Sequence, residues 1–246
     1  MTDAELAGWA ARCRAFVERG GGDAAHDPAH VRRVVAWAER LGREEGADLR
    51  VVVPAAWLHD CVTVPKDAPG RPQASRLAAE AAGAFLRAEG FPDALVPAVE
   101  HAVAAHSWSA GIAPETAEAR VVQDADRLDA LGAIGVARLY ATAGALGAAL
   151  THPTDPVPAE PPARPLDDRR WATDHAYVKL LRLPATMRTA AGRREAERRA
   201  ATLRSFLVEL RRETASAIGP SPSANSGTPS ADGAAPSAGR RTSGPA

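Results

Sequence analysis

The chain has 246 residues and carries 30 basic and 30 acidic side chains, whose charges cancel at pH 7. This balance excludes a global charge that would draw the protein to nucleic acid or to an acidic membrane surface. The length allows one large domain or two small ones, and two cysteines are too few for a disulfide framework or a thiolate zinc site.

The N-terminus and the apolar runs indicate where the protein is located. The first residues lack the basic and then apolar pattern of a signal peptide. No apolar run approaches the roughly 20 residues needed to cross a bilayer. We therefore expect a cytoplasmic protein with no membrane partner.

In the first half of the chain, apolar residues recur at helical spacing. The pattern predicts helices from Thr2 to just before Gly20, from Asp27 to about Gly46, over 49–61, over 74–88, and from Pro92 to about His106. The helix over 49–61 is apolar almost all round, so we expect it at the centre of the fold. A proline-marked loop over 62–72 follows it.

In the second half, a long helical stretch is expected to begin at Pro114 and to run through 121–129 into the small residues of 130–136. Prolines between 147 and 168 indicate a long surface loop, and the last two helices are expected over 171–189 and 193–213. Strand-like alternation is absent. From 216 the composition collapses to Pro, Ser, Gly and Ala, which cannot bury a core. The sequence thus predicts an all-α domain over 1–215 and a disordered tail over 216–246.

Two histidines and an aspartate are placed where a metal ion could bind. His59 and Asp60 follow the apolar run 51–58, where an ionised carboxylate is costly unless it is paired or bound to a metal. His30 lies on the second expected helix, and imidazole and carboxylate together suit a divalent transition ion. A fourth ligand is wanted, and the segment 124–129 offers three carboxylates. Taken singly, each of these is better explained as a helix cap or as the partner of an arginine, so the residues alone leave the fourth ligand open.

The motifs around these residues resemble a known superfamily. His30, then His59-Asp60, then Asp126 within Ala-Asp-Arg-Leu match the H…HD…D signature of the HD-domain metal-dependent phosphohydrolases. The blocks 26–34, 123–138 and 174–181 further resemble the bacterial YpgQ/YedJ-type subgroup. The resemblance covers roughly residues 3–214 and implies a single HD-domain helical bundle.

Carried over by position, the resemblance implies that His30, His59, Asp60 and Asp126 bind a divalent ion, manganese or magnesium. Asp126 is preferred because it occupies the Ala-Asp-Arg-Leu position. Asp124 and Asp129 are then expected to support the site or to cap helices.

The resemblance also implies residues that bind substrate and assist catalysis. Phosphoryl transfer needs cations around the reacting group, and Arg33, Lys66 and Lys179 are the expected substrate-binding side chains. His101 and His106 are five residues apart, about 140° on a helix, so at most one is expected to face the site. His106 fits the subgroup better and is expected to act in catalysis together with Asp60.

The function that the resemblance implies is metal-dependent hydrolysis of a small phosphorylated metabolite by water that the ion activates. A nucleotide is the expected substrate, with a nucleoside triphosphate cleaved to the monophosphate and pyrophosphate. The alternatives are a nucleoside monophosphate phosphatase, a phosphodiesterase, or a non-catalytic sensor that binds metal and nucleotide. The intact ligand set argues against the sensor, and the acidic residues interspersed on the basic last helix argue against nucleic acid as a partner.

Overall fold

The structure is a computed structural model that describes residues 1–19, 28–62, 64, 70, 73–107 and 110–218. Over these residues the regular elements are helical, apart from an isolated bridge between Ala149 and Trp171, which confirms the all-α prediction. None of the described helices has both the length and the apolar character that crossing a membrane requires. The elements are α1 (Asp3–Arg19), α2 (Pro28–Glu45), α3 (Leu49–Leu58), α4 (Ala74–Ala88), η2 (Asp93–Leu95), α5 (Val96–Ala105), α6 (Ala117–Leu128), α7 (Gly132–Ala145), α8 (Ala172–Val178), η3 (Leu180–Arg182), α9 (Leu183–Thr186) and α10 (Ala190–Ile218).

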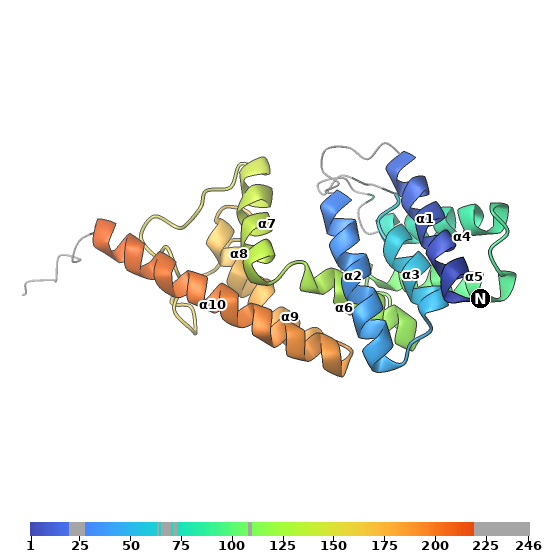
Figure 1. Cartoon of the computed structure of the whole chain (residues 1–246). Coiled ribbons are helices and arrows are strands. Elements are labelled where there is room, and N and C mark those ends of the chain that lie inside the picture. The colour runs from blue at the N-terminus through green and yellow to red at the C-terminus, as the bar shows by residue number, and fades with distance from the viewer. Residues whose placement is uncertain (20–27, 63, 65–69, 71–72, 108–109, 219–246) are drawn as a thin grey trace, which may run out of the picture.

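Helix α3 lies at the centre of the N-terminal bundle, as its apolar sequence predicts. Seven of its ten residues, among them the run Val51–Ala56, are buried, and the helix packs against α1, α2, α5 and α6 (Figure 1). Asp48 caps its first turn by accepting a hydrogen bond from the Arg50 amide at 2.9 Å. A helix covered on so many sides has a fixed axis, so the residues at its C-terminal end are held in a defined place.

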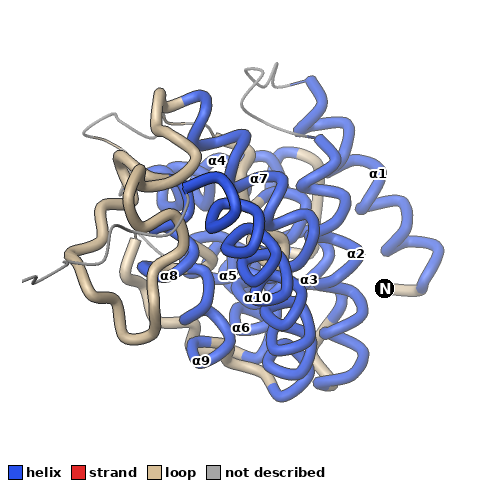
Figure 2. Tube along the Cα trace, turned by 90° about the vertical axis from the view of Figure 1, so that its left-hand side faces the viewer, coloured by secondary structure: helices blue, strands red, loops and turns tan. Residues whose placement is uncertain are grey.

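The long C-terminal helix α10 connects the N-terminal bundle, through α2 and α6, to α7. It runs from α2 and α6 at one end to α7 at the other (Figures 1 and 2). Arg199 on α10 donates to the carbonyl of Leu128 at 2.6 Å, and its guanidinium lies over the Trp37 ring on α2. The end of α6 is therefore braced from outside by α10.

The continuous helix predicted across 121–136 is wrong, because the chain breaks between α6 and α7. Three successive turn hydrogen bonds follow α6, and Leu131 is extended before Gly132 takes a φ of 72°, a left-handed value that favours glycine. A Cβ on Gly135 would lie 2.3 Å from the Ala130 carbonyl oxygen. The small residues therefore permit a tight reversal rather than helix packing.

The single helix predicted over 171–189 is also interrupted. Lys179 leaves the helical region with φ −129° and ψ −59°, and Pro184 then stands in the first turn of α9. Proline has no N–H to bond the carbonyl four residues earlier, so a continuous helix would lose a hydrogen bond there. Helix α10 begins at Ala190 and ends at Ile218, so 216–218, the start of the expected tail, are helical. Residues 219–246 lie outside the described residues.

A buried carboxylate fixes the start of α10. Asp124, on α6, accepts hydrogen bonds from the backbone amides of Arg188 and Thr189 and from the Thr189 hydroxyl, at 2.8–3.0 Å. Thr189 in turn accepts from the Gly192 amide at 3.0 Å. Asp124 thus caps the helix that braces α6.

This capping role predicts a stability defect. Asp124→Ala is expected to lower the free energy of unfolding by about 2 kcal/mol, because buried backbone donors at the start of α10 lose their acceptor. Urea unfolding followed by circular dichroism measures the change. Glu197→Ala, an exposed site on α10, is the control and should change the free energy by no more than about 0.5 kcal/mol. Equal effects of the two substitutions would contradict the capping role.

Candidate metal centre

His59 stands immediately after the last residue of α3. Its Nδ1 lies 2.8 Å from the carbonyl oxygen of Ala56, and a carbonyl only accepts, so Nδ1 carries the proton. The ring is fully buried. Its Nε2 has no hydrogen-bond partner among the described residues. The end of α3 therefore fixes one tautomer, with the Nε2 lone pair directed into the site.

His106 repeats this arrangement at the end of α5. Its Nδ1 lies 2.6 Å from the Val103 carbonyl oxygen, so this ring also carries its proton there and turns Nε2 outward. Nε2 lies 3.5 Å from Asp60 Oδ1, and the ring centroid is 5.0 Å from that of His59. His101, further back on α5, instead accepts a hydrogen bond from the Glu115 amide. The structure places His106, and not His101, beside Asp60.

His30 enters the site from the first turns of α2. Its Nδ1 lies 2.7 Å from Asp129 Oδ2, and its Nε2 lies 3.4 Å from Asp126 Oδ1. The ring centroids of His30 and His59 are 5.5 Å apart. His30 is thus held between two carboxylates of the α6 end, with Nε2 toward His59.

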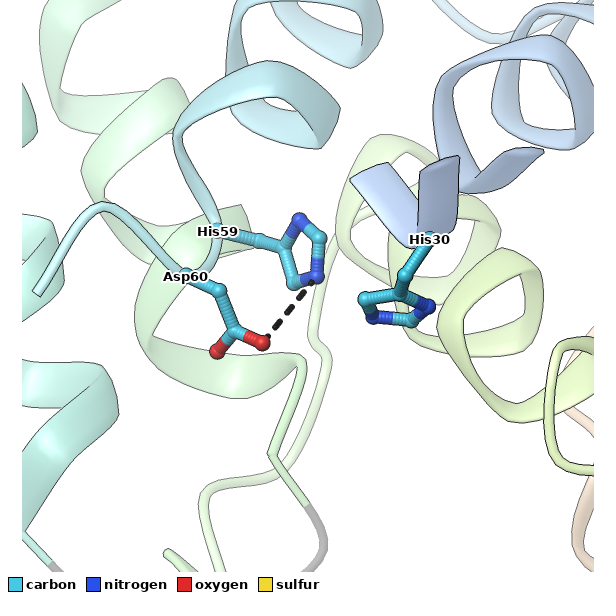
Figure 3. Close-up of side chains that lie close together, drawn as sticks. All are labelled: His30, His59 and Asp60. Carbon is cyan, nitrogen blue, oxygen red and sulfur yellow. Dashed lines mark ion pairs between the residues drawn. The ribbon is translucent and has the colours of Figure 1, made fainter. Parts of the chain in front are cut away.

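Three residues lie close together, and a fourth adjoins them. Ligand atoms of His30, His59 and Asp60 lie within 4.8 Å of one another, and Figure 3 shows the three side chains side by side. Asp126 Oδ1 adjoins this group at 4.0 Å from His59 Nε2, and Asp60 Oδ2 lies 3.6 Å from the same nitrogen. Two ligands that each lie about 2.1 Å from one ion are separated by about 3–4.2 Å, and the distances from His59 Nε2 to Asp60 and Asp126 fall in this range.

The charges of the site favour ionised carboxylates beside the imidazoles. Burial would raise the pKa of Asp126, but the hydrogen bond and charge of His30, with His59 and His106, lower it to about 2. Burial would likewise raise the pKa of Asp60, but its histidine neighbours hold it well below the usual value. The pKa of His59 is lowered by burial, so this ring is neutral at pH 7 and can donate its lone pair.

These residues fit a divalent cation. A buried ring nitrogen without a hydrogen-bond partner is costly. His59 Nε2 lies between two carboxylates, Asp60 and Asp126, whose ion-pair partners within the described part of the chain are histidines. Two imidazoles and two carboxylates suit a divalent first-row metal. His30, His59, Asp60 and Asp126 are therefore the residues that would hold the ion.

The three cations expected to bind substrate have different surroundings. Arg33 donates through Nε to Asp129 Oδ1 at 2.6 Å and through a terminal nitrogen to Asp129 Oδ2 at 3.0 Å. Lys179 is half-buried, and its ammonium makes no hydrogen bond or ion pair with the described part of the chain. Lys66 lies outside the described residues. The substrate-binding roles of all three stay predictions.

Arg138 has no role predicted from the sequence, and Asp129 is expected only to support the site or to cap a helix. Asp129 is buried, and besides His30 and Arg33 it accepts a hydrogen bond from Arg138 at 2.8 Å. Arg138 lies on α7, beyond the break that the continuous-helix prediction missed. The three-residue spacing of Asp126 and Asp129 could have indicated that Asp129 faces the site, because it places both residues on one side of α6.

Comparisons with known proteins assign the chain to a superfamily. The family model of the HD domain matches residues 29–131. The protein YpgQ of Bacillus subtilis, described as uncharacterized, is 33% identical over 192 residues, which are 76% of this chain and 84% of YpgQ. The chain belongs to the HD-domain superfamily.

Solved structures support the same assignment. The crystal structure of Bacillus subtilis YpgQ in complex with ADP superposes with a TM-score of 0.65 at 30% identity, over 85% of this chain and 96% of that one. An HD-superfamily hydrolase from Bacillus thuringiensis gives 0.64 at 29% identity, over 87% and 98%. The chain has the fold of HD-superfamily hydrolases of the YpgQ-like group.

If the four residues hold an ion, removing one ligand should release it. His59→Ala and Asp60→Ala are each expected to weaken Mn²⁺ binding by more than about 100-fold while the helical circular dichroism signal is kept. Calorimetric titration of the metal-free chain with Mn²⁺ measures the affinity. His101→Ala is the matched histidine control and should bind like the unchanged chain. Undiminished binding by the His59 or Asp60 variant would refute the ligand set.

Proposed function

We propose that this HD-domain protein is a nucleoside triphosphate pyrophosphohydrolase that works with a divalent ion, manganese or magnesium. The observation that carries the proposal is His59 Nε2, which is buried, has no hydrogen-bond partner among the described residues, and lies 3.6 Å from Asp60 and 4.0 Å from Asp126. A bound ion supplies the activation of water and the neutralisation of phosphoryl charge that such hydrolysis needs.

Support for a nucleotide comes from a relative. Bacillus subtilis YpgQ has been crystallised with ADP, and the present chain aligns with nearly all of that structure. Nucleotides carry several phosphate charges on a sugar and base, so an ion beside cationic side chains is suited to bind them. We assign Arg33, Lys66 and Lys179 to contacts with the phosphates.

His106 is the residue we assign to proton transfer. Burial alone would lower the pKa of His106, but its contact with Asp60 raises it above the ordinary value, which favours a proton on Nε2. In the proposed reaction a water oxygen bonds to the α-phosphorus while that water releases a proton to solvent, and the bond from the phosphorus to the bridging oxygen breaks. The pyrophosphate leaves with the proton of His106 Nε2, and Asp60 keeps this ring aligned.

The proposed reaction has a direct test. Nucleoside mono-, di- and triphosphates are incubated with the chain and Mn²⁺, Mg²⁺ or a chelator, and phosphate and pyrophosphate are quantified separately. Equimolar monophosphate and pyrophosphate from triphosphates, only with metal, is the expected result. Phosphate released from monophosphates would instead indicate a phosphatase, and binding without turnover would indicate a sensor. His59→Ala, assayed in parallel, controls for a contaminating enzyme.

His106→Ala should separate proton transfer from metal binding. Loss of the proton donor is expected to lower kcat by about 10²- to 10⁴-fold, while Mn²⁺ affinity stays within about 3-fold because the four ligands remain. Steady-state kinetics and calorimetry on the same preparation measure both. His101→Ala, on the same helix, should leave kcat unaffected. A His106→Ala variant with full kcat would show that another group supplies the proton.

A further inference from the structure

Asp129 has more partners than any helix cap requires. It is 3% exposed and follows the last residue of α6. Its two oxygens receive His30 Nδ1 at 2.7 Å, two nitrogens of Arg33 at 2.6 and 3.0 Å, and Arg138 at 2.8 Å. These partners come from α2 and α7, which are far apart in the sequence. The carboxylate is therefore held from both sides.

Its contact with His30 decides which ring nitrogen is available to a metal. A carboxylate flanked by two guanidinium groups stays ionised and only accepts hydrogen bonds. His30 Nδ1 therefore carries a proton, and Nε2, directed at Asp126 and His59, is the nitrogen that is left to face a metal ion. His59 and His106 likewise have a proton on Nδ1, which is fixed by carbonyl oxygens at their helix ends. His30 lies at the beginning of a helix, where carbonyls point away from it, and so needs another acceptor.

We propose that Asp129 is the positioning residue of the metal centre, which fixes the tautomer and orientation of His30, and that Arg33 and Arg138 hold Asp129 in place. This inference rests on the ligand set of the proposed function. A carboxylate that accepts from the second nitrogen of a metal-binding histidine makes that ligand more basic and better oriented, and its loss weakens metal binding.

The inference also changes what Arg33 does. Its guanidinium makes a two-point contact with Asp129, so part of its donor capacity is already used within the protein. Arg33 adds positive charge at the rim of the site and fixes Asp129 at the same time. Arg138 extends this support to α7, so the placement of α7 after the Gly132 break contributes to the geometry of His30.

The test compares two buried aspartates of the same segment. Full-length chains carrying Asp129→Asn, Asp129→Ala or Asp124→Asn are titrated with Mn²⁺ in a calorimeter, after circular dichroism has shown that they are folded. Asp124 is an equally buried control that caps α10 and contacts none of the four ligands through an identified hydrogen bond. Asp129→Asn is expected to weaken Mn²⁺ binding by about 10- to 100-fold, whereas Asp124→Asn should lower the melting temperature with affinity within about 3-fold.

A spectroscopic measurement isolates positioning from stability. With ¹⁵N-labelled histidine and Mg²⁺ as a diamagnetic ion, His30 should show a downfield, slowly exchanging Nδ1–H signal. The signal should persist in Asp124→Asn and disappear in Asp129→Ala. If Asp129→Ala does not fold, the Mn²⁺ affinities of Asp129→Asn and Arg138→Gln still test the positioning role. Arg138→Gln is expected to lose less affinity than Asp129→Asn.

The outcomes separate this inference from the proposed function. Unaltered Mn²⁺ affinity in Asp129→Asn, or a loss no larger than that of Asp124→Asn, would overturn the role of Asp129 and leave the metal site standing. An unchanged chain that binds no Mn²⁺ would overturn both. A specific loss in Asp129→Asn supports the positioning role whichever phosphorylated substrate the enzyme uses.

Discussion

The hydrogen bond from His59 Nδ1 to the Ala56 carbonyl at the end of α3 is the constraint on which the site depends. It caps a helix that is buried on most of its faces and leaves a buried nitrogen without a partner in the described structure. Such a nitrogen destabilises the fold unless a ligand satisfies it, and the nearest groups are carboxylates that need positive charge. The packing of the apolar helix α3 thus buries a ring nitrogen beside two carboxylates, and a bound cation would satisfy all of these groups.

The three aspartates of the α6 end show how one short segment serves three purposes. At 100° per residue, Asp126 and Asp129 lie about 60° apart on the helix, whereas Asp124 lies about 140–160° from both. Asp126 and Asp129 accordingly face His30 on α2, and Asp124 faces the start of α10. Because their positions around the helix axis differ, Asp126 faces the candidate ion site, Asp129 contacts His30, and Asp124 caps α10, the helix that braces α6.

Much of this fold could be predicted from the sequence, because its helices obey apolar periodicity. The bounds of the Ala74–Ala88 helix and the central position of α3 follow from that pattern alone. The break after Asp129 could not be predicted in this way, since Gly132 and Gly135 are compatible with both a helix and a tight reversal. The outcome depends on contacts with α10, where the Arg199 side chain packs against Gly132. The contact between Arg138 and Asp129 could not be predicted for the same reason, because the reversal of the chain brings the two residues together.

The resemblance to the HD-domain superfamily placed His30, His59, Asp60 and Asp126 in one hypothesis, but it could not show what holds each ring. Two of the three site histidines use a backbone carbonyl at a helix end, which any sequence supplies and no motif records. The third uses Asp129, whose identity is visible in the sequence while its partners are not. Because a histidine near a helix start finds no carbonyl to accept its Nδ1–H, a side-chain acceptor must come from elsewhere in the chain. In this protein it comes from the α6–α7 turn, so the reversal that the sequence did not reveal is also what completes the support of the metal centre.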